Sequence, residues 1–246
     1  MALDLAYRDE QEIIAEARHL DDSEICFYPA ESELGHRALA SLRGETLVQR
    51  ERPDFEDLTQ RLLLEVMIVD DHPRPGKKDA TRARETAILR ELREAGFEQM
   101  APNASLLAAV DSGLPTEQDH NYRAYVDHFA TVVVKHSHKI SAYRAQRPGF
   151  DLGFLVFDES TAYFESLGAF GRHSRGRAHV HFADQVFLNV IRDAGVDYVM
   201  WLTPYKVLNT DIGRHILPRL TILDVSLLDG SSHESYDAKR MKSSEK

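Results

Sequence analysis

Hydrophobic and polar positions along the chain recur with spacings that predict both helices and strands. Apolar residues four positions apart predict a helix over 33–42, and Ser32 immediately before it is a suitable N-terminal cap. The nearly uninterrupted apolar run over 61–69 predicts a buried strand. Helices and strands that alternate along the chain indicate an α/β fold. The other predicted helices cover 9–20, 81–95, 122–146 and 181–194, and the other predicted strands cover 46–52, 153–158 and 198–202.

Composition adds a size and a domain organisation to this picture. The chain has 246 residues, 43% of them hydrophobic, which is enough for one large domain with a buried core. We expect an acidic N-terminal helical segment over 1–30, the α/β domain over 31–230 and a flexible tail over 231–246.

Several features that the chain lacks limit where it can act. No apolar run approaches the roughly 18 residues that cross a bilayer, so we expect no membrane partner. The first residues have neither the basic region nor the apolar region of a signal peptide. A single cysteine, Cys26, excludes an internal disulfide and a multi-cysteine zinc site. These features predict a cytoplasmic protein.

Charge is unevenly distributed, and this affects which partners the chain can bind. The formal net charge of -10 by itself disfavours a polyanion. Residues 1–34, however, contain ten acids and two arginines, so they carry -8 and the other 212 residues carry only about -2. Two basic stretches, 74–93 and 172–181, lie in that remainder. Nucleic acid therefore stays a candidate partner, although a solvated surface explains either stretch alone.

Two carboxylates near the predicted buried strand indicate a metal site. Glu65 interrupts the apolar run, and an ionised carboxylate in such a strand requires a partner or a metal. Asp54 lies eleven positions earlier, so a tight connection brings both acids to one end of a sheet. Their oxygen atoms suit Mg²⁺ or Mn²⁺, which activate water and stabilise a phosphate oxygen. A turn residue at Asp54 and a salt-bridged Glu65 form the simpler alternative.

Pro53-Asp54 and the tripeptide Glu65-Val66-Met67 follow a predicted helix and strand in an order that resembles the PD-(D/E)XK nuclease-like superfamily. Pro53-Asp54 looks like that family's proline and metal-binding aspartate, and Glu65-Val66-Met67 stands in the place of its acid-any-lysine motif. The resemblance covers about 31–206. It implies a restriction-endonuclease-like mixed sheet flanked by helices, with Asp54 and Glu65 as metal ligands. Glu33 of the opening helix is implied as an additional acid, with Glu31 as its rival.

Met67 departs from this family pattern, because it stands where the family has a lysine that orients water and offsets charge at phosphorus. Either another cation reaches the same point, or the site is a scaffold that binds without cutting. Lys135 and Lys139 lie four residues apart on one face of the long predicted helix. We take Lys139 as the replacement catalytic lysine, with Lys77 and Lys78 as the next candidates after Lys135.

Histidines offer a competing metal site. Neutral imidazole binds zinc and acts as a general base near neutral pH, so a zinc hydrolase is an alternative. His136 and His138 are two positions apart and do not share a helix face, whereas His179 and His181 share a face only in an extended segment. His72 beside two aspartates would still need a remote histidine. Capped or solvated histidines are the simpler explanation. Six of the twelve histidines lie in 119–123, 135–139 and 173–181.

The ends of two further predicted strands also carry polar residues. Asp158 and Glu159 follow one strand, and Tyr205 and Lys206 follow another, so they could flank a site at one rim of the sheet. Turn formation explains these residues equally well.

These observations favour a metal-dependent nuclease that hydrolyses phosphodiester bonds, taken to be those of DNA, in an anti-phage or DNA-processing system. The alternative is a catalytically inactive, nuclease-like binding subunit of a larger nucleic-acid-processing assembly. Association with a protein partner or with a second copy of the chain is compatible with both.

Overall fold

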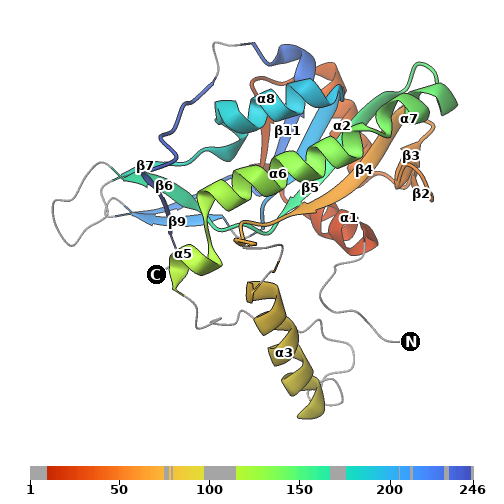
Figure 1. Ribbon diagram of the computed structural model, residues 1–246. Helices are drawn as coiled ribbons and strands as arrows, with labels where there is room; N and C mark the ends of the chain where they lie inside the picture. Colours follow the sequence, from red (N-terminus) through yellow and green to blue (C-terminus); the bar gives the residue numbers. More distant parts are fainter. Residues whose placement is uncertain are drawn as a thin grey trace.

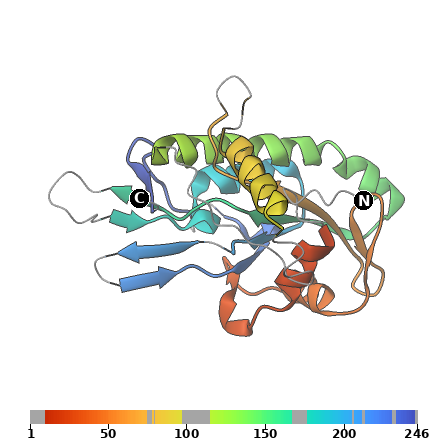
Figure 2. The same cartoon turned by 90° about the horizontal axis from the view of Figure 1, so that it is seen from below.

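A mixed sheet of seven strands forms the middle layer of the fold, and helices cover both of its faces (Figures 1 and 2). The computed structural model describes residues 10–74, 78, 80–96, 115–166, 176–204, 206–210, 213–229 and 233–244. The predicted α/β class is confirmed. In order across the sheet, the strands are β1 (Ile25–Tyr28), β11 (Leu220–Asp224), β8 (Tyr198–Leu202), β5 (Asp151–Asp158), β4 (Leu62–Val69), β3 (Phe55–Asp57) and β2 (Leu47–Gln49).

The centre of the sheet is parallel and its two sides are antiparallel to that centre. Strands β4, β5 and β8 run parallel to one another. On one side β11 is antiparallel to β8, and on the other β3 is antiparallel to β4. Parallel strands are normally buried on both faces, and every residue of β4 except Ile68 is buried. Glu65, in the middle of β4, is therefore enclosed by the fold.

The helices begin and end where local signals favour it. The Ser32 hydroxyl accepts a hydrogen bond from the Gly35 N–H at the start of α2, as its capping position predicted. Asp184 caps α8 in the same way, and Gly195 ends it in the left-handed conformation with a φ of 77°. The helices are α1 (Glu10–Arg18), α2 (Glu33–Arg43), α3 (Ala80–Glu94), α5 (Thr116–Asp119), α6 (Tyr122–Ser137), α7 (Ile140–Gln146) and α8 (Gln185–Ala194).

The long helix predicted over 122–146 is two helices, α6 and α7, separated by His138 and Lys139. The Ser137 hydroxyl donates to the Val134 carbonyl at 2.9 Å, and the Lys139 N–H donates to the His136 carbonyl three residues earlier. Side-chain competition for a backbone carbonyl and a tightened last turn both weaken helix continuation. The break changes the direction of the chain at Lys139.

Alternate residues of β4 face different cores, because side chains on a strand alternate between its two sides. Leu63 and Met67 belong to the core beneath α6 and α8, whereas Leu64 and Val66 belong to the core beneath α1 and α2. Glu65 shares the face of Leu63 and Met67. In Figure 2, α6 and α7 (green) lie on one side of the sheet and α1 and α2 (red) lie on the other.

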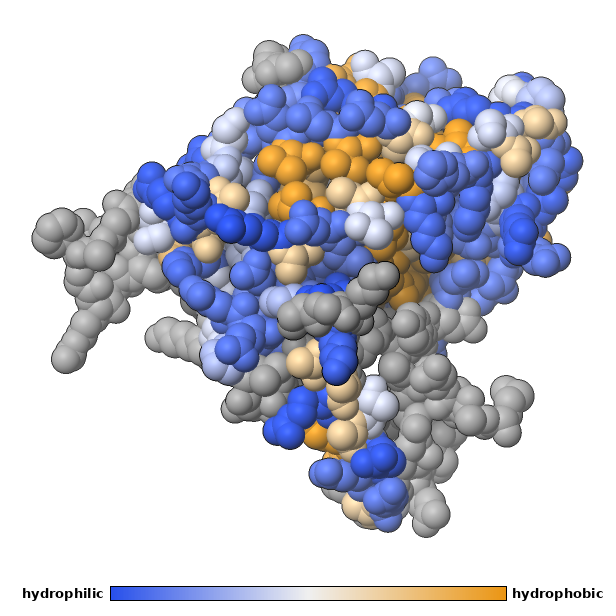
Figure 3. Space-filling view, viewed as in Figure 1, coloured by the Kyte–Doolittle hydropathy of each residue, from blue (hydrophilic) through white to orange (hydrophobic). Residues whose placement is uncertain are grey.

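Smaller elements extend from this body. Helix α3 stands off the sheet in Figure 1. Figure 3 shows apolar side chains at the surface between α6 and α8, the helices that carry the exposed Val134 and Val186. Among the described residues, no helix has the length and apolar character needed to span a membrane.

The remaining elements are the strands β6 (Tyr163–Ser166), β7 (Gly176–Ala178), β9 (Val207–Thr210), β10 (Gly213–Ile216) and β12 (Met241–Ser243), and the 3₁₀ turns η1 (Asp22–Glu24), η3 (His181–Ala183) and η4 (Val225–Leu227).

The described parts of both terminal regions pack against the α/β domain. Ile13 and Ile14 of α1 are buried in the same core as β4, and β1 pairs with β11. Near the other terminus, β12 pairs with β6 and Met241 is buried. The boundaries expected near residues 30 and 230 therefore do not separate independent units, because apolar residues beyond them complete the cores. Lys77, Tyr205 and the cations of 172–175 lie outside the described residues.

Candidate functional site

The pairing of β3 with β4 ends next to the two predicted acids. Strand β3 pairs with β4 only from Leu62 to Leu64. Beyond that point, the Val66 N–H donates a hydrogen bond to Asp54 Oδ2 at 2.7 Å. Because an unpaired buried N–H is costly, the Asp54 side chain takes the place of a strand partner. This bond ties Asp54 to the residue that follows Glu65.

Glu65 is a buried carboxylate with partners on only one oxygen. The residue is 1% exposed. Its Oε1 accepts a hydrogen bond from Lys139 Nζ at 2.5 Å and lies 2.9 Å from His136 Nδ1, whereas the buried Oε2 has no hydrogen-bond partner in the described part of the chain. Burial acts to raise the pKa of Glu65, but the hydrogen bonds from His136 and Lys139 lower it overall. Glu65 is therefore ionised at neutral pH.

Asp54 shows the opposite shift. Burial is the main cause that raises the pKa of Asp54 to about 6; the Val66 N–H lowers it, and the negative charge of Glu65 raises it again. The charge of Glu65 thus acts on Asp54. At neutral pH two carboxylates face one ammonium, that of Lys139. The remaining negative charge and the unpartnered Glu65 oxygen fit a divalent cation with oxygen ligands.

Tyr143 of α7 interacts with the same two acids. Its hydroxyl is buried, and burial followed by the interaction with Glu65 raises its pKa. The Tyr143 hydroxyl and Glu65 thus interact, although they do not meet the geometric criteria of a hydrogen bond in this structure.

Lys139, and not Lys135, reaches the acids. Lys135 is exposed in the last turn of α6, whereas Lys139 lies at the break between α6 and α7 with its Nζ on Glu65. Lys78 is exposed. Met67, on the same face of β4 as Glu65, is buried in the core beneath α6. Met67 therefore packs in the core, and the Lys139 ammonium contacts Glu65 from the junction of α6 and α7.

The structure does not bring Glu33 to Asp54 and Glu65. Glu33 is exposed in the first turn of α2 and is not among the charges that mainly shift the Asp54 pKa, and Glu31 is an exposed partner of His36. Another acid acts on Asp54 instead, since the charge of Glu10, the first described residue of α1, raises the Asp54 pKa.

Glu10 and His136 are the two site residues that sequence reasoning missed. Glu10 belongs to a helix outside the expected domain, 44 positions before Asp54, and no local pattern connects them. In the sequence, His136 stands out only together with His138, as a possible pair of zinc ligands. Its position three residues after the buried Val133 of α6 is the signal that could have placed it on the helix face toward the sheet.

The polar residues at the other strand ends are satisfied within the protein. Asp158, at the end of β5, accepts a hydrogen bond from Trp201 Nε1 at 2.9 Å and pairs with the buried Lys206 at 3.3 Å. His179 and Asp184 form a fully buried pair at 2.8 Å. We therefore assign these groups to the interior of the fold.

Asp71 and His72 belong to a different cluster, at the C-terminal end of β4. His120 Nδ1 lies 2.9 Å from Asp71 Oδ1, so His120 is a remote histidine of the kind that a site at His72 requires. Six strand positions separate Asp71 from Glu65, which corresponds to about 20 Å.

Comparison with known proteins adds no assignment. No model of a protein family matches the chain, and neither a curated protein nor a solved structure matches it. The function is therefore inferred from the residues of this chain.

Proposed function

We propose that the chain is a metal-dependent nuclease that hydrolyses phosphodiester bonds of DNA, with Asp54 and Glu65 as ligands of Mg²⁺ or Mn²⁺. One observation carries this proposal: the Glu65 carboxylate is 1% exposed, bonds Lys139 through Oε1 and has no hydrogen-bond partner for the buried Oε2 among the described residues. Asp54 adds a second carboxylate, and Glu10 acts on it as a third negative charge. Hard oxygen ligands with excess negative charge suit these cations.

Each side chain has a defined part in the proposed hydrolysis. When bound, the cation supplies Lewis acidity at the phosphate. Lys139 Nζ holds the attacking water and offsets charge on the phosphate oxygens. Glu65 Oε1 orients His136 through Nδ1, which leaves His136 Nε2 to accept the proton of that water. The water oxygen forms a bond to phosphorus, the bond from phosphorus to the leaving oxygen breaks, and the leaving oxygen takes a proton from a solvent water, so that a phosphomonoester and an alcohol result.

The order of elements supports a restriction-endonuclease-like core. Helix α2 is followed by β2, β3 and β4, then by α6, α7 and β5, with α3 and α5 inserted after β4. Apart from these insertions and the break between α6 and α7, the order is similar to the restriction-type core of the family, which is a helix, three strands, a helix and a further strand. The four strands are also neighbours in the sheet. In this proposal Lys139 has the catalytic role of the motif lysine, whose position in the sequence is occupied by Met67.

Exposed cations near the site support an anionic substrate. Arg52 is exposed two residues before Asp54, and Lys135 is exposed one residue before His136. Neither forms a salt bridge with another described residue. Lysine and arginine side chains that lack an internal partner are available for phosphate groups of a nucleic acid.

A cleavage assay with matched variants tests the proposal. Purified protein is incubated with linear, supercoiled and single-stranded DNA and with RNA, in Mg²⁺, Mn²⁺ or EDTA. Asp54→Asn and Glu65→Gln should each lower cleavage by at least about 100-fold, because each removes a ligand of the catalytic cation. Glu45→Gln, at an exposed acid without a described ion pair, is the matched control and should cleave like the wild type.

Two outcomes would overturn the assignment. Cation-dependent cleavage that persists in both Asp54→Asn and Glu65→Gln would place the active site elsewhere. Binding of DNA without cleavage of any substrate would replace the nuclease by the inactive binding subunit. An anti-phage or DNA-processing role, with a protein partner or a second copy of the chain, is to be examined once cleavage is established.

A further inference from the structure

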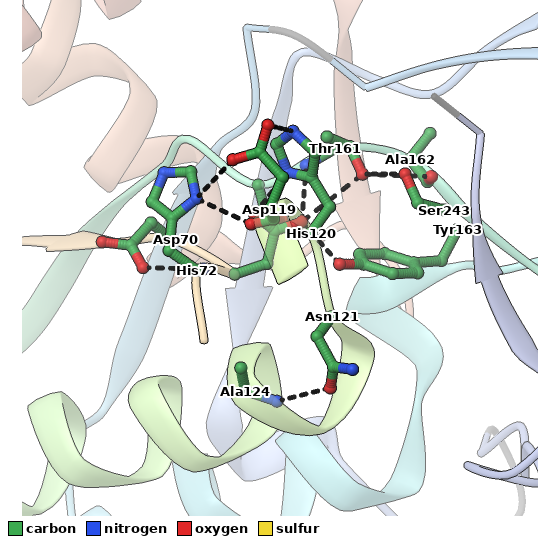
Figure 4. A network of polar contacts seen from close by, with 12 residues as sticks. Asp70, His72, Asp119, His120, Asn121, Ala124, Thr161, Ala162, Tyr163 and Ser243 are labelled. Carbon is green, nitrogen blue, oxygen red and sulfur yellow. Dashed lines mark hydrogen bonds and ion pairs between the residues drawn. The ribbon is translucent and has the colours of Figure 1, made fainter. Parts of the chain in front are cut away.

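A second set of buried polar groups lies where β4 ends and α6 begins. Asp71 and His72 follow β4, and Asp119 and His120 precede α6. In Figure 4 the Asp119 side chain lies between the rings of His72 and His120. None of these residues takes part in the proposed nuclease site.

The Asp71 carboxylate is held by hydrogen bonds on one side. Its Oδ2 accepts from the Tyr163 hydroxyl at 2.5 Å and from the Thr161 N–H at 3.2 Å. These donors leave Oδ1 to the imidazoles, and His120 Nδ1 lies 2.9 Å from it. Asp71 is fully buried, so its orientation is determined by the surrounding protein rather than by solvent.

His72 is oriented by a different partner. Its Nδ1 lies 2.9 Å from the Asp119 carbonyl oxygen. The Asp119 carboxylate flanks both rings, with Oδ1 at 3.9 Å from His72 Nδ1 and Oδ2 at 3.8 Å from His120 Nε2. A carboxylate or carbonyl that contacts a ligating histidine fixes the orientation of the ring and raises its basicity.

The spacing of the three potential ligands is close to that of a metal centre. One ligand atom each from Asp71, His72 and His120 lies within 4.8 Å of the others. Tetrahedral ligands at zinc, with bonds of about 2.0–2.1 Å, are about 3.4 Å apart. Side-chain movements of about 1 Å would therefore close the site. The side chains of His72 and His120 are only 12% and 14% exposed.

We propose that Asp71, His72 and His120 bind one divalent transition metal ion, of the zinc class, as a structural centre. Two imidazoles and one carboxylate favour such an ion over Mg²⁺, which prefers oxygen ligands. With neutral imidazoles, Asp71 and Asp119 contribute two negative charges that the ion neutralises. The metal joins the segment after β4 to the segment before α6, which are far apart in the chain.

The alternative is a metal-free ion pair between Asp71 and a protonated His120. The two possibilities make different use of His72, because its hydrogen bond goes to Asp119 and not to Asp71. An ion pair does not need the His72 imidazole, whereas a three-ligand metal centre does. A His72 variant therefore separates the two without removing either member of the pair.

Metal titration of the full-length chain without an affinity tag tests the proposal. Co²⁺ is the spectroscopic probe and Zn²⁺ the competitor, and bound metal is also counted by elemental analysis after dialysis. The wild type should bind one ion per chain with visible absorption bands that Zn²⁺ displaces and Mg²⁺ does not. His72→Ala should weaken this binding by at least about 100-fold, since loss of outer-shell partners alone costs 10–100-fold. His36→Ala, at an exposed histidine on α2, should leave binding unchanged.

Thermal denaturation gives a second measurement. Zn²⁺ should raise the melting temperature of the wild type and of His36→Ala, but not that of His72→Ala. Asp54→Asn should keep the Co²⁺ absorption, because its carboxylate belongs to the other site, so failure of the nuclease proposal leaves this result unaffected. Equal metal binding by His72→Ala and wild type, or no bound ion in the wild type, would overturn the proposal in favour of the ion pair.

Discussion

Asp54 should destabilise the metal-free protein at neutral pH, and replacing it by asparagine should reveal this cost. The pKa of its carboxyl is about 6 in the folded chain against a usual value of 3.8. The folded protein therefore holds the proton more tightly than the unfolded chain. Between the usual value of 3.8 and about pH 6, the Asp54 carboxyl loses its proton more readily in the unfolded chain than in the folded chain. The free energy of unfolding therefore falls as the pH rises through this range.

The size of the effect follows from the shift in pKa. A shift of about two pKa units corresponds to about 3 kcal/mol, and solvent screening of the half-buried side chain reduces the expected value to about 1–2 kcal/mol. Asparagine can still accept the Val66 hydrogen bond through its amide oxygen but carries no charge. The free energy of unfolding of Asp54→Asn, relative to that of the wild type, should therefore be about 1–2 kcal/mol higher at about pH 8 than at about pH 4.

Urea unfolding in EDTA, followed through the fluorescence of the single, buried Trp201, measures this difference. Glu45→Gln serves as the control and should show no such pH dependence. Added Mg²⁺ should stabilise the wild type more than Asp54→Asn, because only the wild type keeps both carboxylates. A stability difference between Asp54→Asn and wild type that is the same at both pH values would refute the raised pKa and the charge repulsion inferred from it.

Three further changes test other parts of the structure. Lys139→Met should reduce DNA cleavage by at least about 100-fold with little change in DNA affinity, and Lys135→Met should not; equal cleavage rates would remove Lys139 from the mechanism. Met67→Lys should lower the free energy of unfolding by about 2–4 kcal/mol in urea, because it places an ammonium in the apolar core beneath α6, and unchanged stability would show that the ammonium pairs with Glu65 or reaches solvent. Gly153→Ala should cost about 1–3 kcal/mol, since the added Cβ would lie 2.3 Å from the Tyr198 ring; a melting temperature equal to that of the wild type would contradict this close packing.

Local patterns in the sequence were sufficient for the elements and for part of the candidate site. The apolar run over 61–69 predicts a buried strand because its residues cover both faces of β4. A carboxylate within such a run needs a partner, and this argument alone identified Glu65. The hydroxyl of Ser32 and the conformational freedom of Gly195 likewise act within one turn of their helices, so their effects can be read from neighbouring residues.

Only the tertiary structure decided which cations and acids meet. Their four-residue spacing places Lys135 and Lys139 on one face of a continuous helix, where they are equivalent candidates. In the structure Lys139 lies between α6 and α7, and it is the Lys139 ammonium that contacts Glu65. The expected third acid, Glu33, is exposed at the start of α2, and the charge of Glu10 acts on Asp54 instead. Because α1 and α2 pack in the same core, the position of each acid along its helix decides which one acts on Asp54, and no pattern near Asp54 records that position.

The cluster at the end of β4 depends most strongly on tertiary structure. The sequence shows Asp71 beside His72 and shows that His120 exists, but 49 positions separate His120 from Asp71. Their contact requires β4 and α6 to pack together and requires α6 to begin near the point where β4 ends. Periodicity and capping act over one or two turns, whereas the meeting of distant segments is determined by burial of apolar surface across the whole domain.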